Sequence, residues 1–254
     1  MGPIGAHAFG HLINIGSQVG LAAVLGAETY GALGLALLTA STLIFLGDLG
    51  FTSVLVRVAA TGGDWRLAWA RALTPRLAIT PCALALAFAY WGGRHGFGSP
   101  GALCLVAATP GILASLVNAT PILYAIGAGK RAAAATYLRW TIFALGTVLA
   151  LATPEPTTAA LLVGAGFSVG LVAQSLFAAR AADLSLRAMR PVAQGWRDSN
   201  ANAAMSLSML MVVAALNDRA PAFLIEAAAP TYLAAALLLT QILSGITGLM
   251  TQLD

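Results

Sequence analysis

Four charged side chains lie within long apolar stretches of this sequence, where water cannot solvate them. They are Asp48, Arg139, Asp218 and Arg219. A charge placed in hydrocarbon costs at least about 2.5 kcal/mol, so an ionisable residue kept there is a candidate for function. The two arginines could hold an anionic group such as a diphosphate through forked hydrogen bonds. The two acids could instead titrate or bind a cation.

Each of these residues also has a purely structural interpretation. Asp48 is expected near the cytoplasmic boundary, where it could pair with a loop arginine, and Arg139 could extend its side chain to the inner interface. Asp218 and Arg219 point about 100° apart on a helix and would seek partners on other helices. Alternatively, Pro221 ends their helix early and leaves both at the outer interface.

The first apolar stretch is unusually polar. Asn14, Ser17 and Gln18 either face a lumen or make interhelical hydrogen bonds, because lipid offers them no partner. His7 and His11 share a helix face at a spacing that can chelate metal, but no nearby Asp, Glu or Cys completes a site. We therefore expect no metal site and no cofactor.

The elements that must position these residues are transmembrane helices. The chain is 59% hydrophobic and 9% charged with a mean hydropathy of +0.85, whereas a soluble domain carries about 25% charged residues. A bilayer core needs roughly 20 apolar residues per helix. We therefore expect an all-α, polytopic membrane helix bundle of about eight transmembrane helices. Their expected bounds are 5–25, 30–53, 72–92, 101–127, 132–153, 157–179, 202–225 and 230–251.

Basic residues are concentrated on alternate connections, which predicts the orientation. The positive-inside rule places these connections and the N-terminus in the cytoplasm. The segment 180–200 alternates arginines with apolar residues and is expected to lie on the anionic inner leaflet, so nucleic acid is not implied. Tryptophans near helix ends predict interface anchors: Trp65, Trp69, Trp91 and Trp196. The basic residues assigned to the inner side are Arg57, Arg66, Arg71, Arg76, Lys130, Arg131, Arg139, Arg180, Arg187, Arg190 and Arg197.

Two stretches 202 positions apart resemble each other. Residues 25–37 and 227–239 share a threonine, a tyrosine, an alanine and two leucines at matching positions. Six helices separate equivalent points of the two copies. An even number predicts a parallel repeat, related by an axis along the membrane normal.

The first predicted hairpin resembles a known family. The stretch Leu25 to Gly31 reads LGAETYG, and it is followed by Gly47 to Gly50 as GDLG and by Leu55 to Arg57 as LVR. Together with Leu216 to Arg219 and Tyr232, these residues are similar to the O-antigen and polysaccharide flippases of the multidrug/oligosaccharidyl-lipid/polysaccharide exporter superfamily. The resemblance implies two six-helix lobes around a central cavity. The chain would then be a C-terminally truncated member, with a first lobe over 1–179, a cytoplasmic amphipathic linker over 180–200 and the first two helices of an incomplete second lobe over 201–254.

The resemblance implies a transporter of polysaccharide biosynthesis and not an enzyme. It would flip a polyprenyl-diphosphate-linked oligosaccharide from the inner to the outer leaflet of the bacterial inner membrane by alternating access. Its partners would be this substrate and the membrane lipids, and another chain could supply the missing helices of the second lobe. Three alternatives stay open: a cation-coupled multidrug exporter of the same superfamily, a non-functional fragment, and a membrane-embedded polysaccharide polymerase. The expected cavity residues are Arg139, Asp218, Arg219, Asp48, Asn14 and Gln18.

Overall fold

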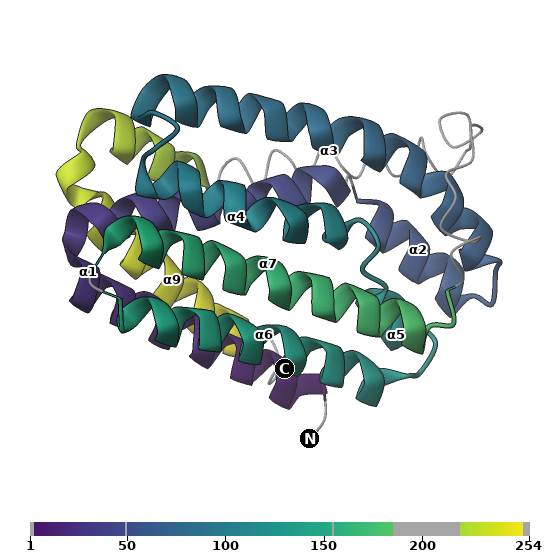
Figure 1. Cartoon of the computed structure of the whole chain (residues 1–254). Coiled ribbons are helices and arrows are strands. Elements are labelled where there is room, and N and C mark those ends of the chain that lie inside the picture. The colour runs from purple at the N-terminus through teal and green to yellow at the C-terminus, as the bar shows by residue number, and fades with distance from the viewer. Residues whose placement is uncertain (1–2, 49, 154, 185–218, 251–254) are drawn as a thin grey trace.

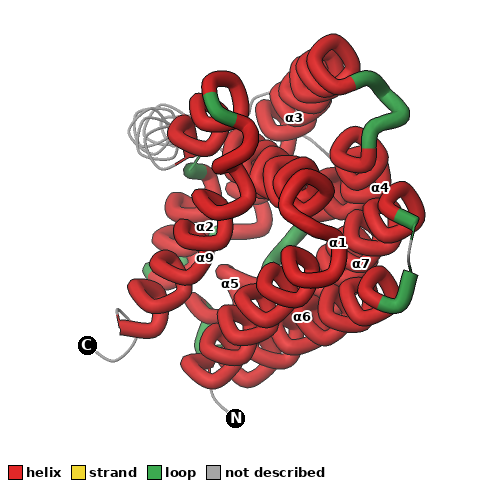
Figure 2. Tube along the Cα trace, turned by 90° about the vertical axis from the view of Figure 1, so that its left-hand side faces the viewer, coloured by secondary structure: helices red, strands yellow, loops and turns green. Residues whose placement is uncertain are grey.

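The computed structural model describes residues 3–48, 50–153, 155–184 and 219–250, the last seven of these by their backbone alone. Helices joined by short loops make up these ranges, and no strand occurs in them (Figures 1 and 2). The all-α prediction is therefore confirmed. The predicted linker beyond residue 184, Asp218, Trp196 and most of the predicted helix 202–225 lie outside the described residues.

Within the described ranges, five helical segments are long and apolar enough to cross a membrane. This is compatible with a membrane helix bundle, whereas the number of eight spans and the division into lobes stay predictions. The five segments are α1 (Pro3–Asp48), α3 (Trp65–His95), α4 (Pro100–Ser115) with α5 (Thr120–Ala125), α6 (Gly129–Leu151), and α7 (Pro156–Ala181).

The helix α1 has two arms that meet at Gly26, where φ is 75° and ψ is 166°. In the first arm, Gly10 lies against Trp140 and Gly20 against Leu151, so this arm runs parallel to α6. In the second arm, Gly47 lies against Leu116, the residue that follows α4.

The directions of the two arms follow from the helices between them. The second arm is parallel to α4, because its residue 32 contacts Gly101 at the start of α4. The helix α4 is parallel to α7 (Cys104 lies against Gly164), and α7 is antiparallel to α6 (Gly166 lies against Gly146 and Gly170 against Arg139). The two arms of α1 therefore run in opposite directions, as the sequence predicts for 5–25 and 30–53.

Replacing Gly26 with alanine is expected to destabilise the chain. Its backbone conformation is open almost only to glycine and costs another residue about 1–3 kcal/mol. A Cβ at this position meets nothing within 4 Å, so the effect would be conformational and not steric. Gly16→Ala, in the first arm and equally open, is the control and should not destabilise. Unfolding of the detergent-solubilised chain by sodium dodecyl sulfate measures both, and equal stability of the two variants would contradict this account of the turn.

Several helix bounds differ from those expected. The second arm ends at Asp48, Gly50 adopts a φ of 69°, and a separate helix α2 (Phe51–Ala60) follows. The predicted helix 72–92 begins earlier, at Trp65, because Asp64 caps it by accepting a hydrogen bond from the Leu67 amide at 3.0 Å.

The three tryptophans predicted as interface anchors that the structure describes lie in the interior. Trp69 is 2% exposed and Trp91 is fully buried, and Trp65 packs in the same apolar cluster as Trp69. The anchor interpretation is therefore wrong for these three side chains. Position near a helix end does not show which way a ring points, and here the rings fill the space between helices.

The predicted helix 101–127 is broken between α4 and α5. Asn118 lies in the break, and its Oδ1 accepts hydrogen bonds from the amide of Thr120 at 3.1 Å and from the Thr120 hydroxyl at 2.7 Å. Pro121, in the first turn of α5, needs no amide partner. Such irregular backbone is tolerated in a membrane where protein buries it or where it lines a polar cavity.

One end of the bundle gathers the arginine-bearing connections. Arg66 donates to the carbonyl of Ala182 at 3.5 Å, and Arg131 donates to that of Ala181 at 3.3 Å. We call this the basic end. The structure thus brings together three connections that the sequence assigns to one side, although it contains no membrane to set their orientation.

The two copies of the sequence repeat pack on each other. The second copy forms a 3-10 turn, η2 (Pro230–Tyr232), and the start of α9 (Leu233–Met250). Gly31 lies against Leu233, the equivalent position 202 residues later, and Gly34 lies against Leu237. Contact between equivalent positions is what a local two-fold axis would produce.

Candidate functional site

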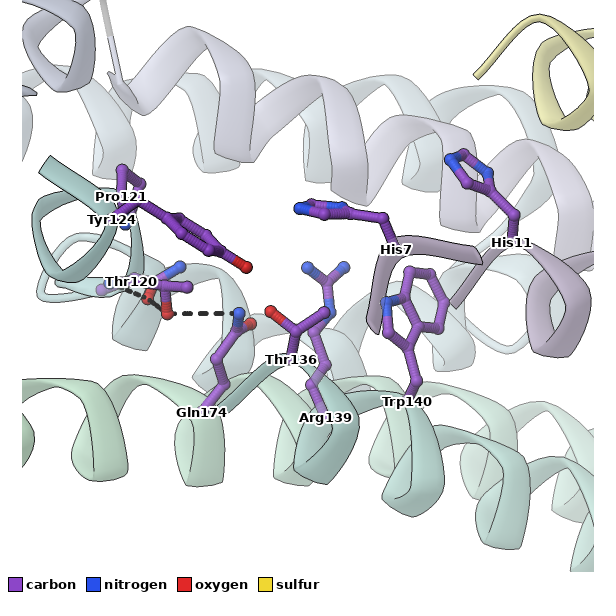
Figure 3. A pocket seen from close by; sticks show the side chains of 10 residues that line it. His7, His11, Thr120, Pro121, Tyr124, Thr136, Arg139, Trp140 and Gln174 are labelled. Atoms are coloured by element: carbon purple, nitrogen blue, oxygen red, sulfur yellow. Dashed lines mark hydrogen bonds between the residues drawn. The ribbon is translucent and has the colours of Figure 1, made fainter. Parts of the chain in front are cut away.

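Two adjoining cavities lie between α1, α3, the α4–α5 break, α6 and α7. The smaller, of about 290 Å³, is lined by four charged residues, and we call it the charged cavity. The larger, of about 450 Å³, is lined mainly by amide, hydroxyl and aromatic groups, and we call it the amide cavity (Figure 3). Both include Asn118, Pro121 and Arg139, so Arg139 stands where they meet.

In the charged cavity, Asp48 forms an ion pair with Arg76. The two side chains are 3.3 Å apart, Arg76 also donates to the carbonyl of Gly47 at 3.3 Å, and it is only 4% exposed. Asp48 also accepts hydrogen bonds from the amide and hydroxyl of Thr52. The acid is therefore paired, but its partner comes from within α3. Assigning Arg76 to a connection was wrong.

Arg139 projects from α6 into both cavities. Its guanidinium carbon lies 4.9 Å from the centre of the Trp140 ring and 5.8 Å from that of Phe167. It makes neither a hydrogen bond nor an ion pair with any described residue. Its position at the cavity wall favours a ligand-facing role over extension toward the membrane interface (Figure 3).

Arg219 enters the charged cavity from a helical stretch over residues 219–228. Its guanidinium carbon lies 5.6 Å from the centre of the Phe45 ring on the second arm of α1. Pro221 lies inside this helical stretch and does not end it. The structure thus brings Arg139, Arg219 and Asp48 to one cavity, whereas Asp218 lies outside the described residues.

Asn14 and Gln18, also expected in the cavity, do not line either of these two spaces. Asn14 donates to the Oε1 of Gln241 on α9 at 2.8 Å, and Gln18 donates to Asn14 at 3.5 Å. Of the two interpretations left open, interhelical hydrogen bonding is the one the structure shows.

The amide cavity contains a short chain of hydrogen bonds that continues the one in the helix break. Gln174 on α7 donates through Nε2 to the Thr120 hydroxyl at 3.3 Å, and that hydroxyl donates to Asn118 (Figure 3). The rings of His7 and Tyr124 stack with centroids 6.2 Å apart. No three His, Cys, Asp or Glu side chains gather to hold a metal ion in the part of the chain that the structure describes.

No family model, curated protein or solved structure matches the chain. The resemblance to flippases therefore depends on the residues of the first predicted hairpin and on Leu216 to Arg219 and Tyr232 alone.

The sequence analysis missed one buried acid, which lies at the end of the bundle opposite the basic end. Glu226 is 6% exposed. It accepts a hydrogen bond from the Tyr90 hydroxyl at 2.9 Å and pairs with Arg94 at 3.4 Å, and its Oε1 lies 3.5 Å from the Nε2 of His95. The sequence could have predicted this acid, because Glu226 is a charged residue at the end of an apolar run, as are Asp48, Arg139, Asp218 and Arg219. Gln174, a lone amide within an apolar run, could have been found in the same way.

Proposed function

We propose that the chain is a flippase-type transporter that binds the diphosphate of a lipid-linked oligosaccharide and moves it from the inner to the outer leaflet. Arg139 is the observation that carries this proposal. Arg139 is half-buried, and a guanidinium partly removed from water without a polar partner among the described residues is costly. An anionic ligand that enters the cavities would supply the missing partner through two parallel hydrogen bonds.

The balance of charge supports an anionic ligand. Arg76, Arg139 and Arg219 line the charged cavity, and Asp48 is the one carboxylate among the described residues that line it. Because Asp48 is already paired with Arg76, it does not neutralise Arg139, whose guanidinium carries a positive charge at the cavity wall. A diphosphate is attracted to such a site, whereas a cationic drug would be repelled.

The arrangement also suits a ligand with a long apolar tail. The polar head would occupy the cavities while the polyprenyl chain stays in lipid, so no hydrophilic group meets hydrocarbon. No bond is made or broken in this process. Rocking of two bundles about a fixed site is the general mechanism for such transport.

A vesicle assay tests the proposal. The full chain is reconstituted into liposomes with a fluorescent polyprenyl-diphosphate oligosaccharide, and the fraction accessible to an external quencher is followed over time. Arg139→Gln is expected to slow movement by about tenfold or more, since a lost charge-assisted hydrogen bond is worth about 1.5–3 kcal/mol.

Arg57→Gln is the matched control, because Arg57 is an exposed arginine of α2 that lines neither cavity. Equal rates for both variants and the unaltered chain would overturn the role of Arg139. Movement of ethidium, with none of the diphosphate lipid, would favour the drug exporter instead.

A further inference from the structure

The amide cavity differs chemically from the charged cavity beside it. Apart from the shared Arg139, its polar lining consists of amides, hydroxyls, an indole and two imidazoles. Amides and hydroxyls both donate and accept hydrogen bonds, as sugar hydroxyls do. With no carboxylate or lysine among the described residues that line it, this space suits a polar ligand without charge.

Two polar atoms at the wall of this cavity have no hydrogen-bond partner among the described residues. They are the hydroxyl of Tyr124 and the Oε1 of Gln174, a side chain that is 4% exposed. A buried polar atom left without a partner costs about 1–3 kcal/mol. A hydroxyl-rich ligand could satisfy both atoms, and Figure 3 shows the Tyr124 hydroxyl pointing toward Thr136 and Arg139.

Aromatic rings stand on both sides of this space. The stacked rings of Tyr124 and His7 lie on one side and Trp140 on the other (Figure 3). The faces of a sugar ring carry C–H groups, which pack on aromatic surfaces while the hydroxyls at the rim reach polar atoms. The volume of about 450 Å³ lies in the range of about 300–1,000 Å³ typical of small-molecule sites.

We infer that the amide cavity is a subsite for the uncharged sugar residues that follow the diphosphate. This inference depends on the proposed function, because it is Arg139 that fixes where the diphosphate ends and the sugar begins. Gln174 and Tyr124 bind the sugar hydroxyls, and the Asn118–Thr120 hydrogen bonds hold Gln174 in position.

Binding to the purified full chain in detergent tests the subsite with three probes that share one tail. They are farnesyl diphosphate, its N-acetylglucosamine conjugate and its glucuronic acid conjugate. The N-acetylglucosamine conjugate, whose sugar is uncharged, is expected to bind about tenfold more tightly than farnesyl diphosphate. Two or three added hydrogen bonds would give this gain. Tyr124→Phe and Gln174→Ala should each reduce this gain to less than about threefold and leave the Kd of farnesyl diphosphate within about twofold.

Tyr232→Phe is the matched control, because Tyr232 is 69% exposed and lies outside the cavity. If farnesyl diphosphate binds but the sugar adds nothing, or the cavity variants weaken both ligands equally, the subsite is overturned and the proposed function stands. If the glucuronic acid conjugate binds more tightly than the neutral one, the assignment to uncharged sugars is wrong. If farnesyl diphosphate itself does not bind, the proposed function fails.

Discussion

Asp48→Asn is expected to destabilise the chain by about 3–5 kcal/mol, the usual effect of removing one partner of a buried ion pair. The reason is Arg76, which is 4% exposed and has Asp48 as its ion-pair partner at 3.3 Å. Asparagine keeps the shape of the side chain but leaves the guanidinium charge uncompensated. Unfolding by sodium dodecyl sulfate, followed by circular dichroism, measures the loss.

A double variant separates charge from shape. Asp48→Asn combined with Arg76→Gln removes both charges, and it is expected to recover most of the stability lost by the single change. Glu28→Gln is the control, because Glu28 is an exposed acid. If Asp48→Asn is as stable as this control, or if the double variant is less stable than Asp48→Asn, the ion pair does not stabilise the chain by compensating the charge of Arg76.

Gly164→Ala should also be strongly destabilising, by about 3 kcal/mol, the upper part of the range for overpacking. Here α7 crosses α4 so closely that a Cβ at Gly164 would collide with the backbone carbonyl of Cys104 and lie 2.8 Å from the Cβ of Ala107. Backbone cannot turn aside as a flexible side chain can. The two helices must separate, and each loses contacts along its length.

Gly93→Ala provides the comparison for Gly164. Gly93 is also helical, on α3, but a Cβ there meets nothing within 4 Å. Alanine at Gly93 should leave stability unchanged or raise it by up to about 1 kcal/mol, since it favours helix. Thermal unfolding of both variants in the same detergent decides the matter, and similar midpoints would mean that the α4–α7 crossing is not tightly packed.

The sequence predicted the position and direction of the helices more accurately than it predicted which side of each helix is buried. Apolar length and the turn at Gly26 are local features, so the two arms of α1 could be expected. The break at Asn118 was not predicted, because the helix 101–127 was drawn from the apolar residues on either side, although Asn118, Thr120 and Pro121 are typical of a turn. Trp69 and Trp91 were assigned to the interface for a related reason: in a membrane protein both the lipid-facing and the buried faces are apolar, so hydrophobicity does not distinguish them.

The candidate site was predictable in part. Charge in hydrocarbon is a strong signal, and it identified Arg139, Arg219 and Asp48, which the structure gathers in one cavity. The same signal could not distinguish a cavity polar group from an interhelical one, as Asn14 shows. Arg76 was misplaced because counting charges on connections takes no account of a side chain that turns back into the bundle.

The cluster around Glu226 has a consequence for movement. Glu226 fastens the 219–228 helix to α3, and Arg219 lies on the same helix seven residues earlier, about 10 Å along its axis. The stretch is continuous helix, so movement of one end is transmitted to the other, with Pro221 as a point where it can bend. A tilt that releases Glu226 from Tyr90 and Arg94 would therefore also shift Arg219 relative to Arg139. Under the proposed function, opening near Glu226 would then weaken the binding of the diphosphate at the two arginines.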